Sequence, residues 1–290
     1  MSRIWLRPQR VLWPILALAV VVRLLTAWPL RQPGYTDAYY YAVGARQLHA
    51  GEGLNEPLIW NYLDPPAGLP HPGYLYWMPL TAMMGWLGMA IMGNSFRAIQ
   101  APFVLTSALL PLVAYAVAWD LTGERRHAIL AGLLAVFPGF YAHVFVLPDS
   151  FAPFALAGSV CLWAVGRGIR DRRPLWFGLA GLAAGFGHLA RADGALLLGV
   201  ALLAVVSTAP QVLSGKHWTV GIGYCALGYL LIMGPWFVRN WQVAGAPLAG
   251  AGTKTLFLRT YDDIFAYGRS LTVESYLAWG WGSILKSKGE

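Results

Sequence analysis

Four stretches of the sequence decide its fold class, and the first of them reads AIQAPFVLTSALLPLVAYAVAW at residues 98–119. It contains no Asp, Glu, Lys or Arg, and the same holds for 127–148, 194–215 and 217–238. A helix needs about 20 apolar residues to cross the hydrocarbon core of a bilayer. Each stretch is long enough, so the sequence predicts a protein that crosses a membrane several times.

The composition agrees with this prediction. Hydrophobic residues make up 57% of the chain, charged residues only 12%, and the mean hydropathy is +0.52. Soluble domains carry about 25% charged residues, so this chain has too few charges to cover a water-soluble globule. The net charge of +8 comes largely from clusters beside apolar segments, which indicates membrane topology and no nucleic-acid partner. Cys161 and Cys225 lie inside apolar stretches and are expected to be buried small hydrophobes.

We therefore predict an all-α, polytopic transmembrane helical bundle of about seven to nine apolar segments, with an interfacial helix in its first outer loop. The first segment is too long for a signal peptide, is interrupted by Arg23 and ends without a small-x-small cleavage site, so it is expected to be retained. The segments are expected at 11–30, 73–93, 97–119, 127–147, 151–169, 175–190, 194–209 and 219–238.

The orientation follows from the basic residues. Arg3, Arg7 and Arg10 precede the first span and predict a cytoplasmic N-terminus by the positive-inside rule. The loop 31–72 is then extracytoplasmic. The later loops then alternate between the two sides of the membrane. The basic loops at 124–126 and 170–173 and Lys216 are expected inside, and Asp149, Arg191 and Arg239 outside.

The region 73–119 does not fit this alternation simply. It has the composition of two spans, yet the orientation allows it only an odd number. We prefer a partly re-entrant 73–93, which Gly85, Gly88 and Gly93 interrupt; the alternative is that Arg125 and Arg126 face outward. By domain, residues 1–240 are expected to form the transmembrane part and 241–290 an extracytoplasmic tail. The chain is then either a fragment of a longer protein or a short one in its own right.

The outer loop is expected to begin with an amphipathic helix at 37–50. Thr36 or Asp37 can cap its start, and Gly51 can end it. The tyrosines near its start suit a helix lying at the headgroup level of the membrane. The loop then returns to the membrane through a proline-rich turn that carries Asp64 and His71.

Acidic residues are scarce, 13 in the chain, so their positions carry information. Asp37 and Asp149 are each either a helix cap or a functional carboxylate, and the predicted topology places both on the outer face. A carboxylate at that face can act as a general base for an incoming hydroxyl or amine. Asp64 precedes Pro65 and Pro66, where turn chemistry alone explains an Asp.

Three arginines stand where the orientation rule does not favour them. Arg191 interrupts an apolar stretch, Arg239 ends the last span and Arg23 lies in the outer half of the first. Each is either a structural residue, through snorkelling or an Arg191–Asp193 turn pair, or part of a guanidinium cluster that binds a phosphate.

Other kinds of site lack support in the sequence. His71, His143 and His188 show no spacing typical of a metal site. There is no Walker A motif, no Gly-x-Gly-x-x-Gly after a strand and no Asp-x-Asp pair. A nucleotide-sugar or ATP site is therefore not predicted.

Several short strings, taken in order, resemble a known family. They are YTDAYY at 35–40, HPGY at 71–74, LPD at 147–149, ARADG at 190–194 and PWFVRN at 235–240. Their order and spacing resemble the N-terminal half of GT-C-type membrane glycosyltransferases. The resemblance is greatest to the group of dolichyl-phosphate-mannose protein mannosyltransferases and the aminoarabinose transferases of lipid A.

The resemblance implies a transferase at the extracytoplasmic face of the cell membrane. It would move a sugar, with inversion, from a polyprenyl-phosphate carrier to a protein, lipid or glycan acceptor. Asp37 then matches the catalytic base, Asp149 a second acid that helps orient the acceptor, and Arg191 and Arg239 cations near the carrier phosphate. No cofactor is expected, although a divalent metal stays open. Asp37 is followed by Ala38 instead of the Glu of the mannosyltransferases, so the resemblance does not identify the sugar.

Two other classes of function compete with this interpretation. A transporter or flippase for a lipid-linked anion would use the same arginines, but its polar residues would continue to the inner face. A non-catalytic scaffold would leave the outer acids unexplained. A transferase requires Asp37 and Asp149 to lie close together.

Overall fold

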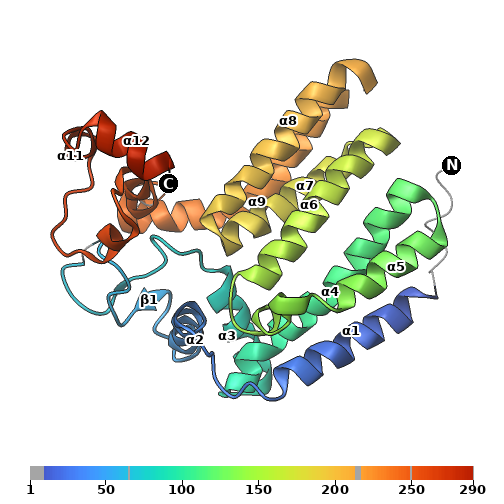
Figure 1. Ribbon diagram of the computed structural model, residues 1–290, viewed down its shortest axis with the longest axis horizontal. Coiled ribbons are helices and arrows are strands. Elements are labelled where there is room, and N and C mark those ends of the chain that lie inside the picture. Colours follow the sequence, from blue (N-terminus) through green and yellow to red (C-terminus); the bar gives the residue numbers. More distant parts are fainter. Residues whose placement is uncertain (1–9, 65, 213–216, 249, 290) are drawn as a thin grey trace. The chain divides into compact units, whose positions relative to one another are not determined.

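The computed structural model describes residues 10–64, 66–212, 217–248 and 250–289 (Figure 1). Arg3, Arg7 and Lys216, which entered the topology prediction, lie outside these residues. The regular secondary structure of the described chain is helical apart from one short antiparallel pair, β1 (Asn55–Glu56) and β2 (His71–Pro72). It divides into two compact units, one of Met1–Glu52 with Pro79–Gly234 and one of Gly53–Met78 with Pro235–Glu290.

The first unit is a bundle of α-helices. They are α1 (Leu12–Ala27), α2 (Thr36–His49), α3 (Leu80–Met92), α4 (Phe96–Thr122), α5 (Arg125–Val136), α6 (Phe151–Asp171), α7 (Leu175–Ala190), α8 (Ala195–Val212) and most of α9 (His217–Ala244). Short 3-10 helices interrupt the chain before α6 and α8; they are η2 (Gly139–Ala142), η3 (Val144–Val146) and η4 (Ala192–Gly194).

The helices of this unit confirm the predicted class. Among the described residues, α4, α6 and α9 are long and apolar enough to cross a membrane. The pair formed by α5 and the 3-10 turns after it passes the same test as a bent span, and α1, α3, α7 and α8 are shorter apolar helices. Together they fall within the seven to nine predicted segments, so the chain is an all-α, multi-pass membrane protein.

One predicted segment is not continuous. The stretch 127–147 was expected to be a single helix, but it bends by 65° between α5 and η2. Pro138 causes the break, because a proline disfavours the helical conformation of the residue before it. Phe137 accordingly leaves the helical region, with φ −112° and ψ 79°, and Gly139 follows with a positive φ of 59°.

The region 73–119 contributes one helix of spanning length. α4 has 27 residues, whereas α3 has only 13. At a rise of about 1.5 Å per residue, a helix as short as α3 covers about 20 Å, well under the roughly 30 Å of a bilayer core. The partly re-entrant interpretation of 73–93 stays a prediction, because α1 and α7, with 16 residues each, are also shorter than a full span.

Close backbone contact holds α7 against α9. A Cβ atom added to Gly181 would lie 2.0 Å from the Cys225 carbonyl oxygen, and one added to Gly228 would lie 2.4 Å from that of Gly178. Small residues let membrane helices approach this closely, and the gain is packing and not the hydrophobic effect. The contact fixes α7, at whose end Arg191 lies. As expected, Cys161 and Cys225 are buried free thiols.

Arg23 is completely buried in α1, with 0% of its surface exposed. Its Nη1 donates to the Val136 carbonyl at 2.8 Å and its Nη2 to the Ala135 carbonyl at 3.5 Å. These carbonyls belong to the last turn of α5, where the break at Pro138 leaves them without helical partners. Arg23 therefore provides hydrogen bonds for the free carbonyls at the end of α5 and stabilises the fold there.

Replacing Arg23 with Met is expected to lower the free energy of unfolding by about 2–3 kcal/mol, because the α5 carbonyls lose charge-assisted hydrogen bonds. Thermal unfolding of the purified protein in detergent measures the change. Arg46→Met is the matched control, since Arg46 is exposed on α2 and its loss should cost under about 0.5 kcal/mol. Equal melting temperatures for the two variants would contradict the capping role of Arg23.

The second unit joins the late part of the predicted outer loop to the predicted tail. Leu63 from the loop packs with Ala251, Ile264 and Leu271 from the tail, and the Tyr62 amide donates to the Ile264 carbonyl at 2.8 Å. The predicted boundary at residue 240 stays a prediction. Besides the β1–β2 pair, the short helices of this unit are α10 (Gly250–Lys254), η5 (Thr255–Phe257), η6 (Tyr261–Phe265), α11 (Val273–Leu277) and α12 (Trp281–Gly289).

Candidate active site

Asp37 lies in the first turn of α2. The residue that precedes the helix is Tyr35, in extended conformation with φ −150° and ψ 168°, and its side chain makes no capping bond. The expectation that Thr36 or Asp37 caps this helix is therefore wrong, because both already have helical positions. Gly51, with a φ of 83°, follows the end of the helix as predicted. The carboxylate of Asp37 benefits from the positive end of the helix dipole.

Asp149 lies just before α6, whose first flanking residue is Ser150. Asp149 is 2% exposed. Its Oδ1 accepts hydrogen bonds from the backbone amide of Ser150 and from the Ser150 hydroxyl, the latter at 3.0 Å. Its Oδ2 accepts one from the Tyr35 hydroxyl at 2.5 Å. Both carboxylate oxygens are thus bonded within the protein, and Asp149 does not cap α6.

Tyr35 brings the two acidic residues together. It stands two positions before Asp37, and its hydroxyl reaches Asp149 from a residue 114 positions away in the chain. Burial, followed by the charge of Asp149, raises the pKa of Tyr35 well above its usual range. The hydroxyl therefore keeps its proton and donates a hydrogen bond to Asp149. This bond ties the start of α2 to the start of α6.

The pKa of Asp37 is raised above its ordinary value of 3.8. Burial is the largest cause, and the negative charge of Asp149 is the next. The positive charge of Arg191 and a hydrogen bond from Thr36 act in the opposite direction. Asp37 is half-buried, and its raised pKa makes it a stronger base than an ordinary carboxylate, as proton abstraction requires.

Arg191 lies in the break between α7 and α8. Its Nε and Nη2 donate to the Asp193 carboxylate at 3.0 and 3.3 Å, so the predicted turn pair is present. Its Nη1 lies 3.5 Å from the Ser150 hydroxyl, and the guanidinium lies over the rings of Phe151 and Phe154. These contacts hold a permanent positive charge beside the two carboxylates.

We call Tyr35, Asp37, Asp149, Ser150 and Arg191 the Asp37 cluster. The sequence predicted that Asp37, Asp149 and Arg191 belong to one face, and the structure brings these three together within the first unit. Tyr35 and Ser150 were missed as members. From the sequence, Tyr35 is expected to be an interfacial aromatic, and only its position next to Thr36 and Asp37 indicates a role in the site.

The other candidate residues make different contacts. Arg23 is buried against α5, as described above. Asp64, His71 and Arg239 belong to the second unit. Arg239 donates through Nη2 to the carbonyls of Gly73 at 2.8 Å and Leu54 at 3.2 Å.

Asp64 and His71 line a cavity of about 520 Å³ in the second unit. Burial, and then the charge of Glu56, raises the pKa of Asp64. The Nε2 atom of His71 lies 3.2 Å from the Leu58 carbonyl oxygen and 3.7 Å from a carboxylate oxygen of Glu56. Among the described residues, no group of three or more His, Cys, Asp or Glu side chains has the arrangement of a metal site.

Residues 70–243, more than half of the chain, match the family described as dolichyl-phosphate-mannose-protein mannosyltransferase. The chain is also similar to enzymes named undecaprenyl phosphate-alpha-4-amino-4-deoxy-L-arabinose arabinosyl transferase. It is 32% identical over 243 residues to that of Pseudomonas paraeruginosa strain PA7, covering 79% of this chain and 40% of the relative. The identity and both coverages are the same for the enzyme of that name from Pseudomonas aeruginosa strain UCBPP-PA14. The chain thus spans about 40% of the length of these relatives.

Proposed function

We propose that this chain, which belongs to the dolichyl-phosphate-mannose-protein mannosyltransferase family, takes part in moving a sugar from a polyprenyl-phosphate carrier to an acceptor. The observation that carries the proposal is the Asp37 cluster, in which a carboxylate with a raised pKa lies beside a second carboxylate and a fixed arginine. A base next to a phosphate-binding cation is the combination that this transfer requires. The similarity to enzymes named for an undecaprenyl-phosphate donor supports this carrier class.

In the proposed reaction, the acceptor hydroxyl or amine attacks the anomeric carbon of the sugar. The bond between that carbon and the phosphate oxygen breaks, and the polyprenyl phosphate leaves with the bonding electrons. Asp37 takes the proton that the acceptor loses. The Arg191 guanidinium stabilises the charge that develops on the leaving phosphate. A single displacement of this kind inverts the anomeric configuration.

Asp149 has a different role in this proposal from that of Asp37. Its two oxygens are already bonded to Tyr35 and Ser150, so it is poorly placed to receive a proton. Its negative charge instead raises the pKa of Asp37. Asp149 is therefore a positioning residue that makes the base stronger, and a contact between Asp149 and the acceptor stays a prediction.

The site is proposed to face the extracytoplasmic side, with the N-terminus in the cytoplasm. The Asp37 cluster lies at the start of α6, whereas Arg167 and Arg170 near the end of α6 bind Asp120 near the end of α4. The positive-inside rule assigns the arginine-rich end to the cytoplasm. The opposite end, with Asp37, is then outside.

The donor class can be tested directly with the purified protein in proteoliposomes. One sugar is offered on undecaprenyl monophosphate, on undecaprenyl diphosphate and on a nucleoside diphosphate, together with lipid, glycan and peptide acceptors. We expect a transferred sugar and released lipid monophosphate only from the first donor. Transfer from the nucleotide sugar alone would contradict the proposal.

The pH dependence of kcat/KM provides a test of the electrostatics. Asp37 must be ionised to act as a base, so activity should rise with pH through its raised pKa, giving an acidic limb above 3.8. In Asp149→Asn a negative neighbour is lost, and the limb should move to lower pH. In Arg191→Gln a positive neighbour is lost, and the limb should move to higher pH.

Opposite shifts in these two variants are required, because a general loss of structure would move both profiles in the same way or not at all. Shifts in the same direction would contradict the assignment of Asp37 as the titrating base.

A further inference from the structure

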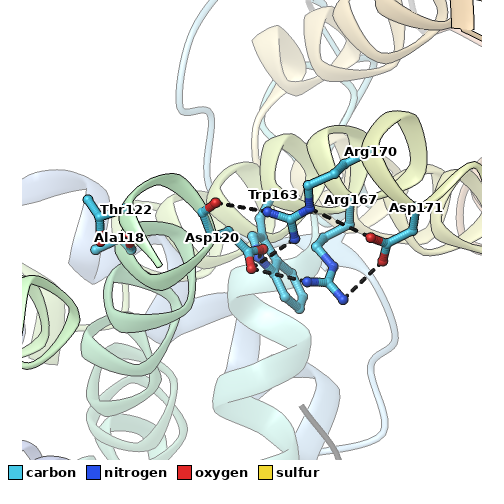
Figure 2. A network of polar contacts seen from close by, with 7 residues as sticks. All are labelled: Ala118, Asp120, Thr122, Trp163, Arg167, Arg170 and Asp171. Atoms are coloured by element: carbon cyan, nitrogen blue, oxygen red, sulfur yellow. Dashed lines mark hydrogen bonds and ion pairs between the residues drawn. The ribbon is translucent and has the colours of Figure 1, made fainter. Parts of the chain in front are cut away.

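A second polar cluster joins the last turns of α4 and α6 (Figure 2). Asp149 and Ser150 of the Asp37 cluster, in contrast, lie at the start of α6. The Asp120 carboxylate accepts hydrogen bonds from the Trp163 indole at 2.7 Å and from Arg167 at 3.1 Å, and it pairs with Arg170 at 2.9 Å. Arg170 also donates to the Asp120 carbonyl at 2.9 Å. Asp171 pairs with Arg167 at 3.0 Å and with Arg170 at 3.6 Å. Two acids offset two arginines, so this network is itself neutral.

The surface next to the network carries an excess of positive charge. Arg125 and Arg126 begin α5 immediately after α4, and Arg172 and Arg173 follow α6; all four are exposed. Glu124 is the acidic residue among them, and it pairs with His127 at 3.3 Å. This end of the bundle therefore attracts anions.

An apolar groove runs into the same cluster. A cavity of about 530 Å³ lies between α4 and α6, with apolar walls that include Val117, Leu121 and Leu162. Its polar lining comes from the network described above, with Asp120, Trp163, Arg167 and Arg170. Leu121 is 81% exposed and Leu162 is 52% exposed. Both helices are long and apolar enough to cross a membrane, so we expect these exposed leucines to contact lipid chains. The Arg170 side chain, 43% exposed, lies where the groove meets the charged surface.

We propose that this groove binds one anionic phospholipid of the membrane. An acyl chain lies along Val117, Leu121 and Leu162, and the headgroup phosphate meets Arg170 with Arg172 and Arg173. The excess of arginines favours a lipid with a net negative charge over a zwitterionic one. Trp163 suits the boundary between chain and headgroup, where its ring is apolar and its N–H is polar. By the orientation proposed above, the lipid belongs to the cytoplasmic leaflet.

Native mass spectrometry of the purified chain tests this, with phosphatidylglycerol and phosphatidylcholine of the same acyl chains as probes. We expect one phosphatidylglycerol to remain bound in preference to phosphatidylcholine. Since each basic residue near a membrane surface contributes about fivefold to anionic lipid affinity, Arg172→Gln/Arg173→Gln should weaken this binding about 30-fold. Arg31→Gln/Arg46→Gln removes the same charge away from the groove and should leave the bound lipid in place.

A second variant separates the groove from general charge attraction. Leu162→Trp fills the cavity without changing any charge, and it should also weaken phosphatidylglycerol binding several-fold. The proposal is overturned if the two double variants lose the lipid equally, or if Leu162→Trp has no effect. It is also overturned if inorganic phosphate displaces the lipid completely, because that result describes a site for a free anion. None of these results depends on sugar transfer.

Discussion

Asp37→Asn is expected to lower kcat for sugar transfer by about 10² to 10⁴-fold, the usual contribution of a general base. The amide cannot accept the acceptor's proton, while its size and hydrogen bonds remain close to those of the acid. Donor binding should change little, because the phosphate is assigned to Arg191. Initial rates in proteoliposomes, together with donor binding measured separately, distinguish loss of chemistry from loss of binding.

Asp262→Asn is the matched control for this variant. Asp262 is exposed in η6 and is not a member of the Asp37 cluster, so its replacement removes one negative charge from a different residue. It should retain the wild-type rate. If Asp37→Asn keeps a rate similar to that of Asp262→Asn, Asp37 is not the base.

The second large effect is expected for Arg191→Gln. Loss of the guanidinium should lower kcat/KM by about 10² to 10³-fold, similar to the loss of one preorganised donor in other active sites. KM for the donor should rise, because the cation binds the phosphate. The value of kcat should fall, because the cation also stabilises the charge that develops as the phosphate leaves. Arg191→Lys should recover only part of the activity, since an ammonium cannot reproduce the planar fork that meets Asp193 and a phosphate.

Arg46→Gln is the control here, because Arg46 is an exposed arginine of the same unit. A merely structural Arg191 would lower the melting temperature without changing KM for the donor. That outcome, with kcat/KM per folded molecule equal to wild type, would remove Arg191 from the proposed site.

Local rules predicted most of the membrane helices. The segment 175–190 coincides with α7, because its length and its uninterrupted apolar composition leave one favourable arrangement. The stretch 127–147 shows the limit of counting apolar residues. Pro138 and Gly139 are both apolar enough to pass such a count, yet their backbone preferences break the helix there.

Contacts between distant parts of the chain account for what was missed. The Tyr35–Asp149 bond and the burial of Arg23 against Val136 join residues more than a hundred positions apart. Nothing in the local sequence distinguishes an arginine that binds the carbonyls at the end of another helix, as Arg23 does with α5, from an arginine that binds phosphate. Topology placed Asp37 and Asp149 on one face, but only the fold shows that Asp149 is already bonded on both oxygens.

The packing of the outer loop on the tail was missed for the same reason. Leu63 stands in a polar loop, and Ile264 in a mostly polar tail, so neither segment alone predicts a core. The cluster forms only when the two segments meet. The cluster is stabilised by the burial of apolar side chains. In loops, apolar residues that become buried do not recur at a regular spacing in the sequence, as they do in helices and strands.

The most direct test of sugar transfer by this protein measures transfer and lipid translocation in the same proteoliposomes. A sugar on undecaprenyl monophosphate is placed in one leaflet, with acceptors on the same side. We expect one released lipid monophosphate for each sugar transferred and an inverted anomeric bond in the product. Asp37→Asn should lose both the transfer and the release. Movement of the intact lipid-linked sugar to the other leaflet without transfer, unchanged in Asp37→Asn, would contradict this expectation and identify a flippase.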